Sequence, residues 1–190
     1  MKKYYYNIID IINLIYNEIY FKLSKITFKG KKIIKGRIFI RGGKNIVIGS
    51  NCLINSGRRY NPIGGDSKTI LWSKGGKISL GNNIKISNVS IVSEKSITIE
   101  DNVMIGANVK IYDTDFHSIN NRERNSYPDN NVKRAEIIIK NGVFIGAHSI
   151  ILKGVIIGEN SVIGAGSVLT KSIPKNEIWA GNPAKFIRKI

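Results

Sequence analysis

His117 is the residue of this sequence whose type and position point most directly to chemistry. It ends the segment Asp113-Thr114-Asp115-Phe116-His117, in which two carboxylates precede an imidazole. An unperturbed imidazole titrates near pH 6.5, so it can take a proton from a hydroxyl and return it within one reaction. The other histidine, His148, falls at a variable place of the pattern described below, and we expect it at the surface. His117 is therefore the candidate general base.

A six-residue repeat indicates which elements would position this histidine. From Ile139 onward an aliphatic residue returns at every sixth place, a glycine often follows it, and the fifth place is small or β-branched; the first places are Ile139, Ile145, Ile151, Ile157, Ile163 and Leu169. The register also occurs at residues 48–54, 80–86 and 99–111. A period of six matches neither a helix nor a simple strand alternation, but it suits a short strand followed by a tight corner. We interpret the first place as inward, the glycine as permitting the turn, and the fifth place as fitting a narrow interior.

The repeat is interrupted directly after the candidate base. Counting in sixes from Ile111 places His117 where an inward aliphatic residue is expected, and the polar segment 117–135 follows before the repeat resumes. Loops of this length in a compact domain usually serve a site. A second insertion, at residues 57–69, interrupts earlier coils. We predict that both insertions lie near the functional site.

Residues 1–35 are predicted to form a separate helical segment. Polar residues recur there at steps of three and four, which gives one polar stripe on a helix that is otherwise Tyr, Ile, Leu and Phe; they are Asn7, Asp10, Asn13, Asn17 and Glu18. These interruptions argue against a signal peptide and against a membrane span. The wide apolar face is expected to be buried against the rest of the protein or a sister subunit, or else in a bilayer interface.

Composition narrows the classes of partner. The formal net charge is +17, which favours anionic partners, yet the basic residues are spread along the chain without a helix-turn-helix, RNP or zinc-ligand pattern. Nucleic acid is therefore not expected as a partner. The one cysteine, Cys52, excludes an intramolecular disulfide and is interpreted as a packed thiol in a reducing compartment. We predict a cytoplasmic protein, with peripheral contact at the inner face of the membrane as an option.

The repeats resemble those of a known family. The tandem hexapeptides of the form [LIV]-G-x-x-[STAV]-x are similar to those of the left-handed parallel β-helix acyltransferases; the ending "IGAGSVLTKSIPKNEIWAGNPAKFIRKI" is similar to their C-terminal signature, and "NVMIGANVKIYDTDFHSI" to the part that carries their catalytic histidine. The resemblance covers about residues 40–190 and is closest to the sugar and polysaccharide O-acetyltransferases. It implies an all-β fold, a left-handed β-helix over residues 36–174 with a short tail at 175–190, and a homotrimer.

The resemblance also implies an activity. It is acetyl-CoA-dependent transfer to a sugar hydroxyl in surface polysaccharide (O-antigen or capsule) biosynthesis, with His117 as general base, no covalent intermediate and no metal. N-acetylation of an amino sugar or antibiotic is the nearest alternative. A non-catalytic scaffold is an alternative of another class, since solenoids make good binding surfaces. A zinc enzyme on the same coil would need three imidazoles, and the chain has two histidines.

The family's binding positions carry over to specific residues here. Coenzyme A is expected to contact the late coils and the terminal element at Ala147, Ala165, Thr170, Lys171, Lys185 and Arg188. The acceptor is expected at Ser87, Asn88, Glu94, Asp113 and Asp115. For Asp113 and Asp115 three roles stay open: they orient the imidazole, bind acceptor hydroxyls or cap the turn. Phe144 stands where these enzymes commonly have tryptophan.

Overall fold

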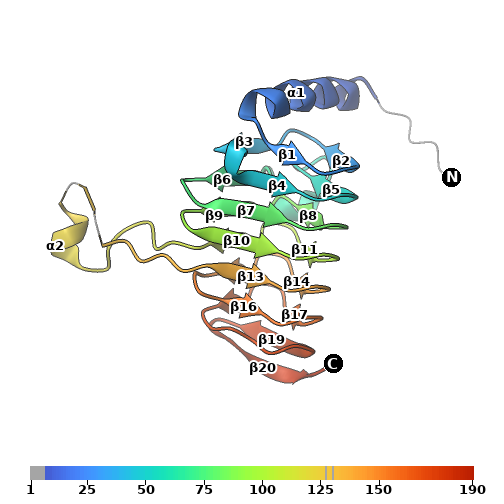
Figure 1. The fold of residues 1–190 in the computed structure, drawn as a ribbon. Coiled ribbons are helices and arrows are strands. Elements are labelled where there is room, and N and C mark those ends of the chain that lie inside the picture. Colours follow the sequence, from blue (N-terminus) through green and yellow to red (C-terminus); the bar gives the residue numbers. More distant parts are fainter. Residues whose placement is uncertain (1–6, 127, 130) are drawn as a thin grey trace.

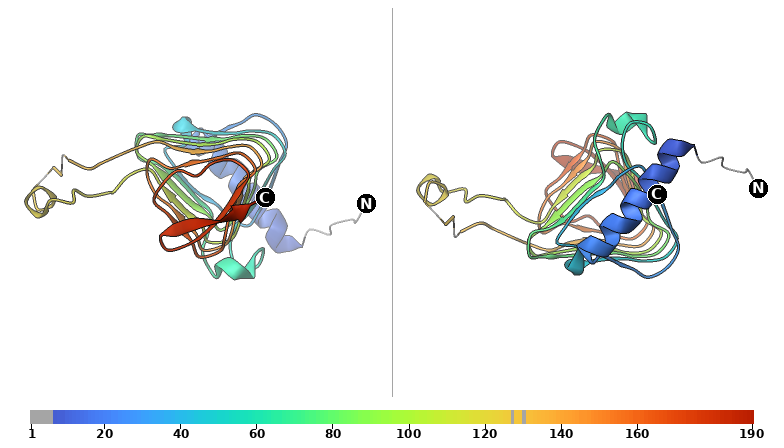
Figure 2. Two further views of the ribbon diagram at one scale, coloured as in Figure 1. Left: turned by 90° about the horizontal axis from the view of Figure 1, so that it is seen from below. Right: turned by 90° about the horizontal axis from the view of Figure 1, so that it is seen from above.

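Short strands stack into three flat sheets, which form the sides of a triangular coil (Figures 1 and 2). The computed structural model describes residues 7–126, 128–129 and 131–190. Sheet A holds β1 (Thr27–Phe28), β4 (Ile46–Ile48), β7 (Lys77–Leu80), β10 (Ser96–Ile99), β13 (Ile137–Ile139) and β16 (Ile156–Ile157). Sheet B holds β2 (Lys32–Lys35), β5 (Cys52–Asn55), β8 (Lys85–Ser87), β11 (Met104–Ile105), β14 (Phe144–Ile145), β17 (Val162–Ile163), β19 (Glu177–Gly181) and β20 (Ala184–Lys189). Sheet C holds β3 (Phe39–Arg41), β6 (Ile70–Ser73), β9 (Ser90–Ser93), β12 (Lys110–Tyr112), β15 (Ile150–Ile151) and β18 (Val168–Leu169).

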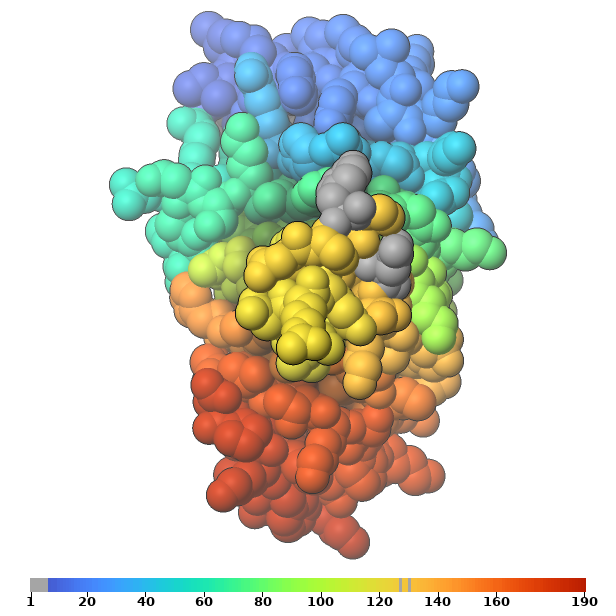
Figure 3. All heavy atoms as spheres, turned by 90° about the vertical axis from the view of Figure 1, so that its left-hand side faces the viewer, coloured from blue at the N-terminus to red at the C-terminus, as the bar shows by residue number. Residues whose placement is uncertain are grey.

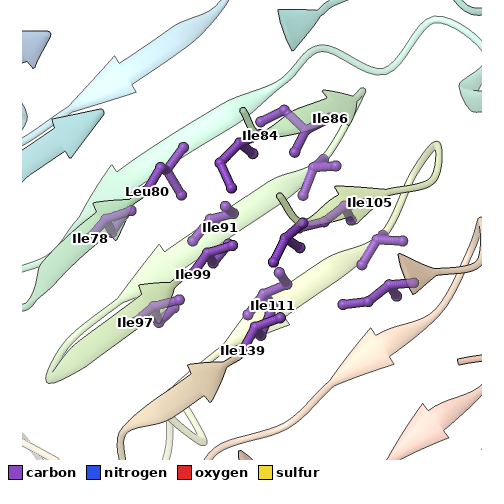
Figure 4. Packing of buried hydrophobic residues seen from close by; sticks show 14 of the residues in the cluster. Ile78, Leu80, Ile84, Ile86, Ile91, Ile97, Ile99, Ile105, Ile111 and Ile139 are labelled. Carbon is purple, nitrogen blue, oxygen red and sulfur yellow. The ribbon is translucent and has the colours of Figure 1, made fainter. Parts of the chain in front are cut away.

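The first place of each hexad builds the core, as the sequence predicts. Ile99 pairs with Ile139 in the next coil, and Ile139 pairs with Ile157 in the coil after that. All three are at most 1% exposed, and their side chains stack inside the coil with those of the other two sheets (Figure 4). The fifth place is also buried, and Cys52 lies in the same interior as a free thiol. Burial raises the pKa of that thiol, which keeps it protonated.

The glycine at the second place has a different purpose from the predicted one. Its φ is not positive at Gly106, Gly146 or Gly158, so the turn does not require it. A Cβ on Gly146 would instead lie 2.5 Å from the backbone nitrogen of Ala165 in the next coil. Close stacking of successive corners therefore excludes a side chain at this place.

The left-handed residue of each corner is the fourth of the hexad. Asn102, Asn108 and Asn160 have φ near 58°, and His148 has φ 63° at the place that Asn108 occupies one coil earlier. Asparagine tolerates this conformation better than most residues. His148 is exposed, as predicted, and its Nδ1 lies 3.2 Å from the side-chain amide of Asn108.

Helix α1 (Ile8–Ser24) lies across the first coil (Figures 1 and 2). Hydrogen bonds of Asn17 and Tyr20 to the coil show that its polar side faces inward. Asn7 and Asp10 form a capping box at its beginning, and Lys25 ends it in the left-handed conformation. The amide of Asn17 donates to the carbonyl of Gly36 at 2.8 Å, and the hydroxyl of Tyr20 bonds to the backbone of Ile40. The first coil has no coil above it, so these side chains satisfy backbone groups that would otherwise be unpaired.

Most of the apolar surface of α1 does not pack on the coil, although Phe21, at 5% exposed, is buried in the core against Phe28. Most of the large aliphatic side chains of the helix are more than 45% exposed, whereas Asn17 is 2% exposed. The expectation that this face is buried against the rest of the same chain is therefore wrong: the polar stripe occupies the contact with the coil. None of the helices in the described part of the chain is long and apolar enough to cross a membrane.

Two segments leave the coil, and a hairpin ends it. The earlier insertion contains η2 (Pro62–Gly64) and lies against the coil. The other short helix, η1 (Gly43–Asn45), forms a corner between β3 and β4. The later insertion projects far from the coil as a narrow arm that carries α2 (Asn121–Arg124), as Figures 1 and 2 show, and Figure 3 looks along this arm toward the coil. At the far end β20 pairs antiparallel with β19.

Candidate functional site

The arm leaves the coil through a two-legged neck. Thr114 and Arg134 form an antiparallel bridge, and the N–H of Asp115 donates to the carbonyl of Lys133 at 3.1 Å. Below them, the N–H of Ala135 donates to the carbonyl of Asp113 at 3.0 Å. These bonds fix the two ends of the arm against each other, directly after β12.

Phe116 turns the chain at the top of this neck. Its φ is 63°, an uncommon conformation for a bulky residue that costs roughly 1–2 kcal/mol. The ring packs edge-on against Tyr112 with the centroids 5.3 Å apart, and its N–H donates to the hydroxyl of Thr114. The ring is thus anchored on the coil, and the next side chain, His117, points to the outside.

His117 is exposed rather than inward. Its side chain is 70% exposed, so counting in sixes from Ile111 does not extend past β12. The reason is that Asp113 and Thr114 already belong to the neck and no longer follow the coil. The imidazole therefore stands at the base of the arm with one side open.

An aspartate from the far leg of the arm lies behind the imidazole. Oδ2 of Asp129 is 3.4 Å from Nδ1 of His117 and also accepts the N–H of Ser118 at 2.9 Å. The Asp129 side chain is only 15% exposed, and its Oδ1 is buried with no hydrogen-bond partner in the described part of the chain. Asp129 is not recognisable as a site residue from the sequence, because nothing in its polar segment indicates that the chain folds back there.

Asp113 caps a turn and does not face a ligand. It is fully buried, and its oxygens accept the hydroxyl of Ser93 at 2.6 Å and the N–H groups of Glu94 at 2.7 Å and Lys95 at 2.9 Å. Of the three predicted roles, the structure supports turn capping. The prediction that Asp113 binds the acceptor is wrong for this reason.

Glu94 and Asp115 are paired with cations around the neck. Glu94 lies 2.7 Å from Lys74 and 2.6 Å from Arg134, and Asp115 lies 2.6 Å from Lys153. Burial alone would raise the pKa of Glu94, but the hydrogen bonds and charges of Lys74 and Arg134 outweigh it, so the pKa is lowered. Asp115 retains a buried oxygen, Oδ2, with no hydrogen-bond partner among the described residues.

Ser87 and Asn88 lie away from this group. Ser87 ends β8 and Asn88 follows it at the corner before sheet C, whereas Glu94, Asp115 and His117 lie beyond the other end of sheet C. Asn88 is fully buried and holds the 57–69 insertion, since its oxygen accepts the N–H of Gly57 and its amide donates to the carbonyl of Asn61. Its predicted contact with an acceptor is therefore wrong. The hydroxyl of Ser87 accepts from the amide of Asn55.

The residues expected to contact coenzyme A lie on the late coils. Ala147 and Ala165 stack at the corner before β15 and β18, and Thr170 and Lys171 follow β18 at the next corner. Thr170 and Lys171 are exposed, as are Lys185 and Arg188 on β20. Lys185 on β20 is paired with Ala180 on β19. The Cβ of Ala180 lies next to Gly164, which precedes Ala165 in the chain. Lys185 is therefore close to the corner that contains Ala165. Five of these six positions thus lie beside the last strands of sheet C. The sixth, Arg188, is farther along β20.

Similarity to known proteins agrees with this architecture. Residues 136–171 match the family model of the bacterial transferase hexapeptide, and residues 96–112 match the hexapeptide repeat of succinyl-transferase. The structure is similar to that of AntD, an N-acyltransferase from Bacillus cereus, in complex with dTDP and coenzyme A, with a TM-score of 0.72 and 26% identity over 90% of this chain and 88% of that one. The late coils thus carry hexapeptide repeats like those of bacterial transferases, and the fold resembles that of an acyltransferase. The predicted fold class, a left-handed parallel β-helix, is thereby confirmed.

Several acetyltransferases are also similar to this chain. A galactoside acetyltransferase in complex with coenzyme A has a TM-score of 0.61 and 32% identity over 86% of this chain and 64% of that one. The galactoside O-acetyltransferase of Escherichia coli is 43% identical over 54 residues, and a putative acetyltransferase of Staphylococcus aureus is 43% identical over 74 residues. These two matches cover 28% and 39% of this chain, and 27% and 36% of the relatives' own length. Among the described residues there is no group of three His, Cys, Asp or Glu side chains that could hold a metal ion.

Proposed function

We propose that this protein transfers an acetyl group from acetyl-CoA to a hydroxyl of a carbohydrate, with His117 as the general base. The observation that carries the proposal is the pairing of an open imidazole with a nearly buried carboxylate, 3.4 Å from His117 Nδ1 to Asp129 Oδ2. A carboxylate beside Nδ1 favours the tautomer that has its proton on Nδ1. Nε2 is then free to accept a proton from the hydroxyl that attacks.

The reaction then needs one base and no covalent intermediate. The hydroxyl oxygen attacks the thioester carbonyl while its proton passes to Nε2 of His117, and a tetrahedral oxyanion forms. When the carbon–sulfur bond breaks, the imidazolium returns that proton to the departing thiolate of coenzyme A. The carboxylate of Asp129 stabilises the imidazolium between the two steps, because the charge appears beside it.

Basic residues at the C-terminal end of the coil support coenzyme A as the donor. Lys171, Lys185 and Arg188 are all exposed, and cationic side chains of this kind suit the phosphates of the cofactor. Coenzyme A was bound in both the AntD complex and the galactoside acetyltransferase complex. We therefore assign Ala147, Ala165, Thr170, Lys171, Lys185 and Arg188 to its site.

A homotrimer would complete the site. The His117 side chain is 70% exposed, and the arm projects away from its own coil (Figures 1 and 2). A neighbouring copy that received the arm would cover the open side of His117.

We extend the proposal to a trimer in which the acceptor lies between two copies. We also propose surface polysaccharide precursors as the acceptor class. Asp115, Glu94 and Ser87 remain candidate acceptor contacts.

N-acylation of an amino sugar is the second candidate. It is favoured by the similarity to AntD, which was solved with dTDP-4-amino-4,6-dideoxyglucose and coenzyme A at 27% identity and a TM-score of 0.72. The same base would then take a proton from an amine that attacks.

One experiment separates these candidates. The purified protein is incubated with acetyl-CoA and a panel of sugars, nucleotide sugars and amino sugars, and products are identified by a mass gain of one acetyl group. Treatment with alkaline hydroxylamine then removes an O-acetyl ester and leaves an N-acetyl amide. Labile acetyl on a sugar confirms the proposal, stable acetyl on an amino sugar supports the second candidate, and no release of free coenzyme A with any acceptor would argue for a non-catalytic scaffold.

A further inference from the structure

Helix α1 presents a continuous apolar surface at the N-terminal end of the coil. Nine large side chains on this helix are between 41% and 76% exposed: Ile8, Ile9, Ile11, Ile12, Leu14, Ile15, Tyr16, Ile19 and Leu23. A helix that lies on a folded body normally turns its apolar stripe toward that body. Here the arrangement is reversed, so the face that is costly to expose to water forms the outer surface of the molecule.

Specific contacts hold the helix in this orientation. The hydroxyl of Tyr60 donates to the carboxylate of Asp10 and accepts from the amide of Asn13, and the guanidinium of Arg37 donates to the carbonyl oxygen of that same amide. Glu18 pairs with Lys32 at 3.2 Å. Together with the bonds of Asn17 and Tyr20, they fix the polar stripe against the first coil. The outward direction of the apolar face is therefore built into the fold.

The same end of the molecule is strongly basic. Residues 7–45 contain nine Lys or Arg residues and two acidic residues, a net charge of +7. Seven of the nine basic side chains are exposed; Lys22 and Lys25 are at the end of α1, and Lys29, Lys31, Arg37, Arg41 and Lys44 are in the coil segment that follows it. An exposed apolar helix with basic residues around it has the composition of a helix that lies in a membrane interface.

We propose that α1 docks this end of the coil on an anionic lipid bilayer, with the helix lying in the plane of the interface. The apolar side chains would enter the boundary between headgroups and acyl chains, and the surrounding cations would contact anionic headgroups. A second copy of the chain fits less well, because two such ends brought face to face would place the +7 charges against each other. The inference is independent of the proposed catalytic site, which lies several coils away (Figure 1).

Vesicle flotation of the full chain tests the proposal. Vesicles of phosphatidylcholine alone are compared with vesicles that contain 30% phosphatidylglycerol, at low and at high salt. We expect the protein to float with the anionic vesicles, with reduced binding at high salt and little binding to neutral vesicles. The double variant Ile15→Gln/Ile19→Gln should lower the partition coefficient by about tenfold or more, because it removes two apolar side chains from the interface.

A matched variant makes the result specific. Ile156→Gln/Ile187→Gln changes two exposed isoleucines at the opposite end of the coil and should float like the parent protein. Both double variants alter exposed positions, and an unchanged melting temperature shows that they fold. Equal flotation of the two variants would overturn the proposal. So would the absence of binding to anionic vesicles, whether or not the protein instead self-associates through α1 in sedimentation velocity.

Discussion

Asp129 approaches His117 from the opposite leg of the arm, so that its Oδ2 lies 3.4 Å from the imidazole Nδ1. The same oxygen accepts the N–H of Ser118, the residue after the histidine. The carboxylate is thereby held by the backbone that carries the imidazole, and the two groups keep their relative position. From this arrangement we expect different effects when His117 and Asp129 are replaced.

Replacing the imidazole should abolish most of the activity. We expect His117→Ala to lower kcat by at least about a hundredfold, the effect of removing a general base. The side chain is exposed, so the melting temperature should stay close to that of the parent. The control is His148→Ala, which removes an exposed imidazole elsewhere on the coil. Activity near the parental level in His117→Ala would refute the assignment.

Replacing the carboxylate should have a smaller effect that depends on the histidine. Asp129→Asn removes the charge but keeps the shape, and we expect kcat to fall roughly tenfold to a hundredfold with little change in KM for acetyl-CoA. In the double variant with His117→Ala, the second substitution should cost nothing further, because Asp129 acts through the imidazole. Fully multiplicative losses in the double variant would show that Asp129 acts by another route.

Glu94 should make stability depend on pH in the acidic range. Its pKa is lowered in the folded protein, so its ion pairs with Lys74 and Arg134 stabilise the fold above the ordinary glutamate value of about 4.3, and this contribution is lost as the pH falls through the lowered value. At pH 7 we expect Glu94→Gln to destabilise by about 1–2 kcal/mol.

Melting temperatures measured from pH 7 down to pH 3 test this prediction. The gap between the parent and Glu94→Gln should be largest at neutral pH and should close toward pH 3. Glu136→Gln, at an exposed position, serves as the control and should show no gap. A gap that stays constant over the range would mean that the charge of Glu94 is not the cause.

The corner glycines should resist substitution for reasons of space. In Gly146→Ala the new Cβ would lie 2.5 Å from the nitrogen of Ala165, so the coils must shift and we expect a loss of about 1–3 kcal/mol. His148→Gly in the same corner should be tolerated, because glycine accepts its φ of 63° without strain. Thermal unfolding of the two variants gives the comparison, and equal stability would contradict the account of close stacking.

The hexad pattern predicts the coil well because each place has one physical requirement. The first place of the hexad lies in the core, as at Ile139 and Ile157, so it must be aliphatic. This requirement recurs every six residues and is therefore recognisable in the sequence. The purpose of the glycine is less visible, because a tight turn and a close neighbour both exclude a side chain. The two are distinguished by the φ of Gly146, which is not positive, and by the position of Ala165 relative to Gly146.

The site was only partly predictable because it depends on contacts outside the period. His117 stands out by type and by its place at the interruption, but its exposure follows from the neck that begins at Asp113. Asp129 joins it through the folding of a loop whose sequence has no regular pattern. Asp113 and Asn88 are buried because their side chains hold turns through hydrogen bonds to the backbone. An aspartate or an asparagine can equally well bind an acceptor, so the residue types alone do not distinguish the two roles.

The polar stripe of α1 also limits how far the coil can grow. An open end of a β-helix is a row of free backbone N–H and C=O groups, which is a template for the strands of another molecule. Asn17 and Tyr20 occupy such groups on the first coil, and at the other end β20 adds to β19 in the opposite direction as the edge strand of sheet B. Each end is thus closed by an element that cannot repeat. End-to-end addition of further parallel coils from another molecule is therefore discouraged.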